Sequence, residues 1–323
     1  MEGYLGLDVG SVSTNLVLIN SENEIMVSLY LRTRGEPIKV VQEGLKEVGQ
    51  KLSGVPVQIR GVGTTGSARH LTGVVVGADV VKNEITAHAV AANLVAPGVQ
   101  TVLELGGQDS KIIILRHGVV ADFAMNTVCA AGTGSFLDHQ AARLGIPIEK
   151  FGEMALNSKH PVHIAGRCSV FAESDMVHKQ QVGHSTEDII AGLCDALVRN
   201  YLNNVGKGKD IQPPVVFQGG VAANVGIKLS FEKALSQEVI VPQHFAVMGA
   251  LGAALISKQA SRKKQVTNFR GFELSDFNYE TSSFECQGCP NICEIVNISM
   301  EGKLLARWGS RCGKWDNLVE AVP

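Results

Sequence analysis

A pattern of three short predicted strands occurs twice in this chain of 323 residues, and this internal repeat constrains the fold more than any other feature. The predicted strands are residues 4–10, 15–20 and 25–32 in the first copy and 101–107, 110–116 and 119–125 in the second. In each copy an acidic residue, Asp8 or Glu104, precedes a glycine-containing turn between the first two strands. Such a duplication predicts two similar subdomains that face each other.

Helix and strand patterns alternate in the rest of the chain up to about residue 260. Helices are predicted over residues 37–52, 81–96, 186–205 and 247–259, and further strands over 57–63, 214–218 and 238–242. Ser185 is placed to cap the longest of these helices. Together with 35 glycines, this alternation predicts the α/β class with many tight turns. The polar residues 260–264 are interpreted as a linker to a C-terminal part.

Three glycine turns that follow strands predict a nucleotide site. Backbone N–H groups of such turns can surround phosphate, because glycine permits close approach. Asp8, at the end of its strand, could hold Mg²⁺ through water as a hard oxygen ligand. The other residues of the predicted site are Ser11, Ser13 and Thr14 in the first turn, Gly106, Gly107 and Gln108 in the second, and Gly219 and Gly220 in the third. Each turn alone could be simple hairpin geometry.

A fourth glycine segment, Gly61-Val-Gly-Thr-Thr-Gly66, formally matches the dinucleotide-binding pattern G-x-G-x-x-G. The expected acidic residue about 20 positions later and a convincing helical unit are both missing. We therefore interpret this segment as a strand-to-helix loop.

Two single cysteines, Cys129 and Cys168, each precede a segment with the composition of a helix start. The positive end of a helix and its unpaired N–H groups favour thiolate, which is the form that binds metal. Two thiolates are half of a four-thiolate iron–sulfur site, and a second identical subunit would complete it. The alternative is that both are small buried hydrophobic residues. Cys194, inside the apolar face of a long helix, is interpreted as a core residue.

The C-terminal part has four further cysteines in the spacing C-x2-C-x3-C followed by a distant fourth: Cys286, Cys289, Cys293 and Cys312. Residues 294–299 and 303–308 look like a hairpin that would bring the last cysteine back to the other three. Four thiolates on a short hairpin predict a closed metal site, and so small a module would need the metal to fold. Zinc and a second iron–sulfur cluster remain equally compatible with this pattern.

The charge balance argues against nucleic acid and against an anionic membrane as partners, because 29 basic residues are offset by 31 acidic ones with no long basic run. The N-terminal residues do not resemble a signal peptide, and no apolar run reaches membrane-spanning length. Seven cysteines in a chain of this kind favour metal or redox chemistry over disulfides. We therefore expect a cytoplasmic protein.

Taken together, the motifs resemble those of the actin, sugar-kinase and heat-shock-protein ATPase superfamily. Within it the chain is similar to the ATP-dependent activators of 2-hydroxyacyl-CoA dehydratases and their relatives in benzoyl-CoA reductase. The resemblance covers about residues 3–258 and rests on Asp8-Val-Gly-Ser, Glu84-x-x-x-His88-Ala, Gly106-Gly-Gln-Asp109-x-Lys111, Cys129-Ala-Ala-Gly-Thr-Gly134, Cys168-x-Val-Phe-Ala-Glu-Ser174, Gly219-Gly-Val-Ala-x-Asn224 and Gly249-Ala-Leu-Gly-Ala-Ala254.

The resemblance implies a duplicated actin-like (ribonuclease H-like) ATPase fold. It also implies a homodimer with one 4Fe–4S cluster at the subunit interface, held by Cys129 and Cys168 of each chain. ATP binding and hydrolysis would change the angle between helices at the cluster. The activator would then pass one low-potential electron to a partner iron–sulfur enzyme, after reduction by a ferredoxin- or flavodoxin-type donor.

The residue roles implied are catalysis by Asp8, Glu104 and Asp109, and ATP/Mg²⁺ binding by a larger set. That set is Asp8, Gly10, Ser11, Val12, Ser13, Thr14, Gly106, Gly107, Gln108, Asp109, Gly132, Gly219, Gly220, Val221, Asn224 and Gly249. The chain departs from the family at Glu104 (usually Asp), at Asn15 (often Lys or Arg) and at Thr127-Val128 (often a polar pair). None of these departures removes a cluster ligand.

The expected domains are residues 1–96 with 245–260, residues 97–244, and a linker with a cysteine-rich module over 261–323. Glu84 and His88, four residues apart on one helix, are interpreted as a packing or salt-bridge pair rather than as catalytic groups. Glu173 could touch the nucleotide or be a surface acid. The rival functions are a small-molecule kinase of the same fold, which needs a catalytic base but neither cysteine, and a non-redox ATPase with buried cysteines.

Overall fold

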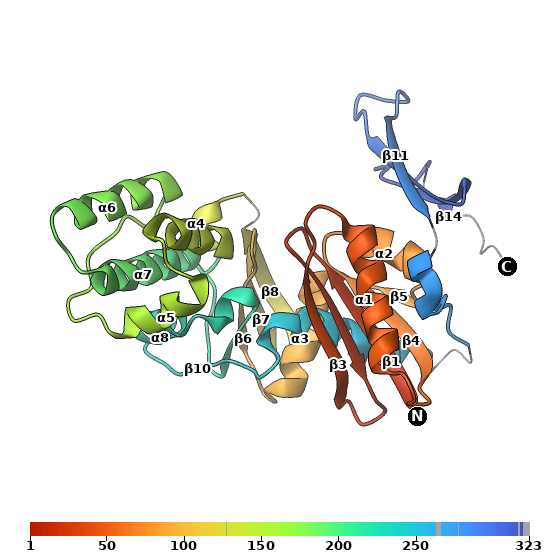
Figure 1. Cartoon of the computed structure of the whole chain (residues 1–323), viewed down its shortest axis with the longest axis horizontal. Helices are drawn as coiled ribbons and strands as arrows, with labels where there is room; N and C mark the ends of the chain where they lie inside the picture. Colours follow the sequence, from red (N-terminus) through yellow and green to blue (C-terminus); the bar gives the residue numbers. More distant parts are fainter. Residues whose placement is uncertain (127, 263–265, 277, 316, 319–323) are drawn as a thin grey trace. The chain divides into compact units, whose positions relative to one another are not determined.

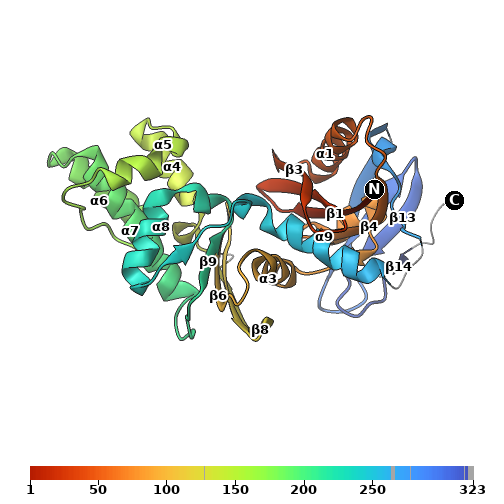
Figure 2. The same ribbon diagram turned by 90° about the horizontal axis from the view of Figure 1, so that it is seen from below.

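The computed structural model of the chain describes residues 1–126, 128–262, 266–276, 278–315 and 317–318. It contains two compact units, which Figures 1 and 2 show from two directions. The first unit is Met1–Lys82 with Ala253–Pro323, and the second is Asn83–Gly252. These boundaries differ from the expected 1–96 with 245–260 and 97–244. Helix α3 (Glu84–Val95) and the start of helix α9 (Met248–Ser261) belong to the second unit.

The first unit is built on a five-stranded sheet in the order β3-β2-β1-β4-β5. Its strands are β1 (Glu2–Val9), β2 (Ser13–Ile19), β3 (Ile25–Arg32), β4 (Gln58–Thr65) and β5 (Val80–Val81). The first three form the predicted antiparallel meander, and β4 pairs with β1 in parallel. Helices α1 (Pro37–Lys51) and α2 (Arg69–Val76) contact these strands, and Leu16, Leu45 and Val62 are fully buried in the core between them.

The end of helix α9 packs on the other face of β4, where Gly61 and Gly63 allow its backbone to approach. A Cβ atom on Gly63 would lie 2.3 Å from the carbonyl oxygen of Ala253, and one on Gly61 would lie 3.0 Å from that of Ser257. Gly61 and Gly63 are inside the strand and serve helix–sheet packing. Only the third glycine of the G-x-G-x-x-G match, Gly66, lies in the predicted strand-to-helix loop, which is the short connection 66–68 to α2.

The second unit repeats the arrangement of the first, with a five-stranded sheet in the order β10-β9-β6-β7-β8. Its strands are β6 (Thr101–Leu105), β7 (Ser110–Arg116), β8 (Val119–Asn126), β9 (Val215–Gln218) and β10 (Val239–Ile240). Again three antiparallel strands are followed by two parallel ones. This shared topology confirms the internal repeat and the mixed α/β fold.

Helices cover both faces of the second sheet (Figure 1). Helix α3 lies on one side, and on the other side lie α4 (Gly134–Leu144), α5 (Ile148–Leu156), α6 (Ser169–Gln181), α7 (Thr186–Asn204) and α8 (Val225–Leu235). As predicted, Ser185 caps α7, because its side chain accepts a hydrogen bond from the Asp188 N–H.

The helix predicted to begin at residue 81 begins later, at Glu84. The Asn83 side chain caps it by accepting a hydrogen bond from the Thr86 N–H at 2.9 Å, and Val80–Val81 form β5 instead. None of the described helices is both long and apolar enough to cross a membrane.

The C-terminal residues form a separate four-stranded sheet in the order β11-β12-β13-β14. Its strands are β11 (Tyr279–Glu285), β12 (Glu294–Met300), β13 (Lys303–Trp308) and β14 (Asn317–Leu318). The pairing of β12 with β13 confirms the predicted hairpin. The predicted linker, residues 260–264, lies partly outside the described residues, at 263 and 264, and α9 extends to Ser261.

Candidate functional site

Equivalent hairpin turns connect the first two strands of each sheet. In the first unit the Gly10 N–H donates to the Ser13 carbonyl at 2.9 Å, and in the second the Gly106 N–H donates to the Asp109 carbonyl at 3.0 Å. Asp8 occupies the end of β1, and Glu104 the corresponding part of β6. The sequence repeat therefore produces the same turn twice, with an acidic residue on the strand before each turn.

Thr33 supports the first turn through two hydrogen bonds. Its hydroxyl donates to the Gly10 carbonyl at 2.9 Å, and its N–H donates to the Val12 carbonyl at 2.9 Å. Thr14 is fully buried and its hydroxyl lies 3.0 Å from that of Thr33, whereas Ser11 is exposed. Thr14 thus supports the turn, and Ser11 remains accessible to a ligand.

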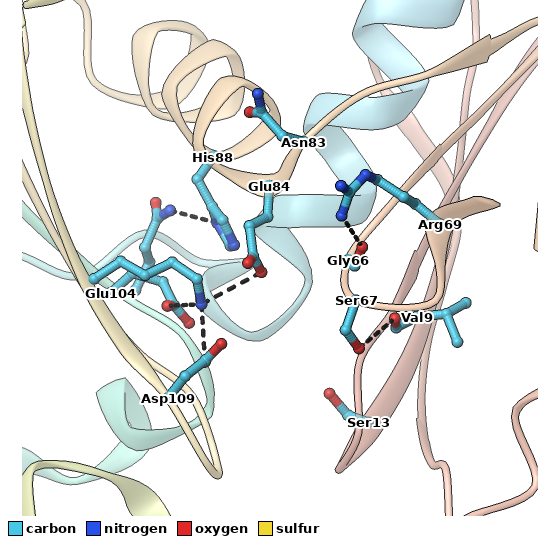
Figure 3. Close-up of polar contacts among 12 residues, drawn as sticks. Val9, Ser13, Gly66, Ser67, Arg69, Asn83, Glu84, His88, Glu104 and Asp109 are labelled. Atoms are coloured by element: carbon cyan, nitrogen blue, oxygen red, sulfur yellow. Dashed lines mark hydrogen bonds and ion pairs between the residues drawn. The ribbon is translucent and has the colours of Figure 1, made fainter. Parts of the chain in front are cut away.

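The second turn borders a buried cluster of charges around Lys111 (Figure 3). The Lys111 ammonium lies 2.8 Å from Asp109, 2.9 Å from Glu104 and 3.4 Å from Glu84, and the Lys111 side chain is only 2% exposed. Glu104 and Lys111 face each other in the β6–β7 register, and Glu84 reaches the cluster from α3. Three carboxylates surround one ammonium, so the cluster favours a further cation when all are ionised.

The electrostatics of this cluster follow from burial and from the close carboxylates. Burial alone would lower the pKa of Lys111, but Glu104, Asp109 and Glu84 outweigh it and raise that pKa above its usual value. Burial raises the pKa of Glu104, and the Lys111 charge opposes that shift. Lys111 is therefore charged at every physiological pH.

His88 and Glu84 have separate partners in this structure. His88 Nδ1 lies 2.8 Å from the Gln218 amide nitrogen, and burial, followed by the nearby Lys111 charge, lowers the pKa of His88 to about 4. His88 is therefore neutral at pH 7. The predicted pairing of Glu84 with His88 is therefore not found among the described residues: Glu84 forms an ion pair with Lys111, and His88 hydrogen-bonds to Gln218 of β9.

The third glycine turn follows β9 within the second unit. Gly219 has φ +91°, and a Cβ atom there would lie 2.3 Å from the Leu105 carbonyl oxygen, so only glycine fits. Val221 is buried, and the Asn224 side chain caps α8 by accepting from the Ile227 N–H at 3.1 Å. Gly220 begins a short 3-10 turn, and Gly249 lies in the first turn of α9.

Cys129 and Cys168 both lie immediately before helical segments, as predicted, and both are partly exposed. Cys168 is the N-cap of α6. Cys129 precedes a 3-10 turn (Ala130–Gly132), and α4 begins only at Gly134. Cys194 is 1% exposed and burial raises its pKa, which confirms it as a core residue.

Asn200 of α7 contacts the loops of both cysteines. Its amide donates to the Gly166 carbonyl at 2.6 Å, two residues before Cys168. A Cβ atom on Gly132, three residues after Cys129, would lie 2.7 Å from the Asn200 side-chain oxygen. The two thiols are therefore on neighbouring loops fixed by one buried side chain, an arrangement compatible with a shared metal cluster.

The helices after the two cysteines are also joined, because Glu173 of α6 forms an ion pair with Arg143 of α4. Three apolar side chains near the thiols are exposed beside the exposed Arg167: Val128 is 96% exposed, Val170 66% and Phe171 65%. Thr127 lies outside the described residues. The apolar side chains next to the cysteines form a surface that water solvates poorly.

The tail cysteines lie on two loops that contact each other. The Cys286 N–H donates to the Cys293 carbonyl at 2.8 Å, and the Trp315 indole N–H lies 3.2 Å from the Cys286 sulfur. Hydrogen bonds from Trp315, then from the Gly288 N–H, lower the pKa of Cys286. Among the described residues, no three His, Cys, Asp or Glu side chains are arranged as metal ligands.

Several site residues could not be identified from their own motifs. Lys111 was part of a matched motif without a role, and the register of β6 and β7, set by the turn, could have paired it with Glu104. Asn126 and Asn200 carry no sequence signal, because their contacts depend on the folded loops. Asn126 accepts from the Cys129 N–H at 3.0 Å and donates to the Cys129 carbonyl at 2.8 Å.

Comparison with known proteins agrees with this fold. The family model described as "BadF/BadG/BcrA/BcrD ATPase family" matches residues 5–257. The chain is 34% identical to the (R)-2-hydroxyglutaryl-CoA dehydratase activating ATPase of Acidaminococcus fermentans, over 80% of this chain and 98% of that protein. It is 32% identical to the 2-hydroxyisocaproyl-CoA dehydratase activator of Clostridioides difficile, over 81% of this chain and 97% of that protein.

A solved structure of an activator of the 2-hydroxyisocaproyl-CoA dehydratase from Clostridium difficile, with bound ADPNP, superposes with a TM-score of 0.73. It is 31% identical and covers 81% of this chain and 97% of its own. The family model spans both sheets, both hairpin turns and both cysteine loops of this chain. The chain belongs to the BadF/BadG/BcrA/BcrD ATPase family.

Proposed function

We propose that this chain is an ATP-dependent electron-transfer activator. It would use ATP binding and hydrolysis to deliver a low-potential electron from a 4Fe–4S cluster, shared by two copies of the chain, to a partner iron–sulfur enzyme. The observation that carries the proposal is the pair of partly exposed thiols, Cys129 and Cys168, on loops that Asn200 contacts together. A small-molecule kinase would need neither thiol.

A homodimer follows from counting ligands. Each chain supplies two thiolates where a 4Fe–4S cluster takes four, so a second copy related by twofold symmetry would complete the set. The exposed side chains of Val128, Val170 and Phe171 flank the thiols and would be buried by that copy. When bound, the cluster would supply a one-electron redox centre.

The nucleotide would bind at the glycine turns of the repeat. We assign ATP and Mg²⁺ binding to the turn residues 10–14 and 106–109 with Asp8, and to Gly132, Gly219, Gly220, Val221, Asn224 and Gly249. Asp8, Glu104 and Asp109 would orient the metal and the attacking water. Lys111 fixes Glu104 and Asp109 in place through two short ion pairs.

The acceptor would be a metalloenzyme that requires a strongly reducing electron. Candidates are a 2-hydroxyacyl-CoA dehydratase, a benzoyl-CoA reductase-like enzyme and a double-cubane cluster protein. Cys129 and Cys168 would hold the cluster, which would supply one electron to the partner in each transfer, and a ferredoxin- or flavodoxin-type donor would reduce the cluster again.

Anaerobic reconstitution with iron and sulfide tests the proposal. The expected result is a brown dimer that loses its interfacial cluster in both Cys129→Ala and Cys168→Ala while nucleotide binding is retained. Cys194→Ala is the matched control, because that thiol is buried in the core and should leave the cluster intact. A cluster that survives either of the first two substitutions contradicts the assignment. Phosphorylation of an added sugar or acid would instead support the kinase.

The C-terminal module is a separate metal proposal. Cys286, Cys289, Cys293 and Cys312 would hold zinc or a second iron–sulfur cluster, since the loops that carry Cys286 and Trp315 already contact each other. Iron and zinc should be counted in the whole protein and in Cys289→Ser, whose native thiol is exposed. The variant should lose one metal centre and keep the interfacial one. An unchanged metal content would refute a tail site.

A further inference from the structure

The turn Gly106–Asp109 is hydrogen-bonded directly to the first residues of α4, the helix that follows the loop of Cys129. The Gly106 carbonyl accepts from the Gly134 N–H at 2.9 Å, and the Gly107 carbonyl accepts from the Ser135 N–H at 2.8 Å and also from the Ser135 hydroxyl. Gly134 permits this approach, because a Cβ atom there would lie 3.1 Å from the Gly106 oxygen. The first turn of α4 therefore donates to two successive carbonyls of the hairpin turn.

The hydrogen bonds continue from α4 to the cysteine. The Thr133 hydroxyl and N–H donate to the Ala130 carbonyl at 2.8 and 3.0 Å, and Asn126 bonds both the N–H and the carbonyl of Cys129. On the other side, Asn126 faces Ser110 in the β7–β8 register, directly after the turn. The Cys129 loop is thus attached to both ends of the turn.

The hydrogen bonds from α4 begin at two rigid peptide groups of the turn, Gly106–Gly107 and Gly107–Gln108. The Gly106 carbonyl shares a plane with the Gly107 N–H, and the Gly107 carbonyl shares one with the Gln108 N–H. Because both peptides are trans, each N–H points away from the carbonyl that α4 holds. A phosphate bound by these N–H groups would pull on the same planes whose oxygens bond Gly134 and Ser135.

We propose that these two peptide planes transmit the state of the bound phosphate to Cys129, with Ser135 as the positioning residue that fixes the second plane. The inference rests on the proposed function in one respect, since it takes the turn Gly106–Asp109 as a phosphate site. It adds a route by which nucleotide controls one cysteine loop. Cys168 lies outside the route, because its loop is hydrogen-bonded to Asn200 of α7, which among the described residues touches the Cys129 loop at Gly132 without a hydrogen bond to it.

The test measures thiol reactivity in the metal-free protein. Iodoacetamide labelling of the Cys129 and Cys168 peptides is followed by mass spectrometry with ADPNP, with ADP and without nucleotide. In the native protein ADPNP should change the Cys129 rate more than the Cys168 rate. Ser135→Ala removes one hydrogen bond to a backbone carbonyl, and should reduce the ADPNP effect on Cys129 by about two- to tenfold. Nucleotide affinity is measured in parallel.

Ser174→Ala is the matched control, since that hydroxyl donates to the Val170 carbonyl of its own helix at 3.0 Å and, within the described part of the chain, has no hydrogen bond to the turn or to a cysteine loop. It should keep the full nucleotide effect. If ADPNP binds but Cys129 reactivity does not respond, or if Ser135→Ala responds like the native protein, the route through the two peptide planes is refuted and the proposed function stands. If ADPNP and ADP do not bind at all, both proposals fail.

Discussion

Replacement of Lys111 by methionine tests the charge cluster of the second unit. Methionine keeps much of the volume and removes the ammonium that lies 2.9 Å from the buried Glu104 carboxylate and 2.8 Å from Asp109. With an effective dielectric constant of about 20, Coulomb's law gives about 6 kcal/mol for the Glu104 pair alone, much of which desolvation offsets. Because the substitution leaves a buried carboxylate without its counter-charge, we expect a loss of about 3–5 kcal/mol at neutral pH.

The loss should depend on pH in a defined direction. Without the ammonium nothing opposes the effect of burial, so the pKa of Glu104 should rise further above its usual value. An acid whose folded pKa is raised destabilises the protein as pH rises through the unfolded value of about 4.5 and above it. The difference between native protein and variant should therefore shrink near pH 5 and be largest above pH 7.

The assay is urea unfolding followed by far-ultraviolet circular dichroism, together with hydrogen exchange of the β7 amides. Tryptophan fluorescence is unsuitable, because Trp308 and Trp315 both lie in the C-terminal part. Lys209→Met is the control, since its partner Asp122 is 54% exposed and solvent screens the pair, so the substitution should change the stability little. A Lys111→Met loss as small as this control, or one that does not shrink in acid, would refute the reasoning.

Three further substitutions give distinct results. His88→Gln should remove a loss of stability in acid, measured by unfolding at several pH values. The pKa of the native His88 is about 4 in the folded protein and about 6.5 in the unfolded one, so protonation favours the unfolded state. The free energy of unfolding of the native protein should therefore fall by up to about 3 kcal/mol as pH falls from about 6.5 to about 4. Gly63→Ala should lower the midpoint of thermal unfolding, with a loss of about 1–3 kcal/mol or more, because the Ala253 carbonyl occupies the space of the new methyl group. Glu173→Gln should lose less than about 1 kcal/mol, since its partner Arg143 is half exposed; a larger loss in urea unfolding would show that the ion pair supports the helices more than expected.

The strands of the repeat could be predicted because their side chains alternate and their turns contain glycine. Both meanders and their hairpin turns were found as predicted. Helix α2 (Arg69–Val76) was missed, since Thr72, Gly73 and three valines give it a poor helix propensity, and packing against β1 and β4 stabilises it instead. Helix α5 (Ile148–Leu156) was also missed, because it is short and follows a proline.

The candidate site was predictable where chemistry follows from residue type, and not where it follows from tertiary contact. Cys129 and Cys168 were identified from local helix-start composition, and their positions before helical segments are confirmed. The contact of Asn200 with both loops, and the three partners of Lys111, bring together residues up to 68 positions apart in the chain, the distance from Gly132 to Asn200. No local pattern records such contacts, because they form only after the helices pack on the sheet.

The segment before the C-terminal sheet is part of the first unit's hydrophobic core. Leu274 is 2% exposed, and its carbonyl accepts a hydrogen bond from the Gln42 amide at 2.8 Å. Phe272 packs against Gly49 of α1, where an added Cβ atom would lie 3.2 Å from the Phe272 Cβ. A shortened protein that ends near residue 262 would expose this apolar surface over α1 and would be prone to aggregate. The shortest soluble ATPase fragment for crystallisation or binding studies should therefore extend to residue 276, beyond the last residue that the family model matches.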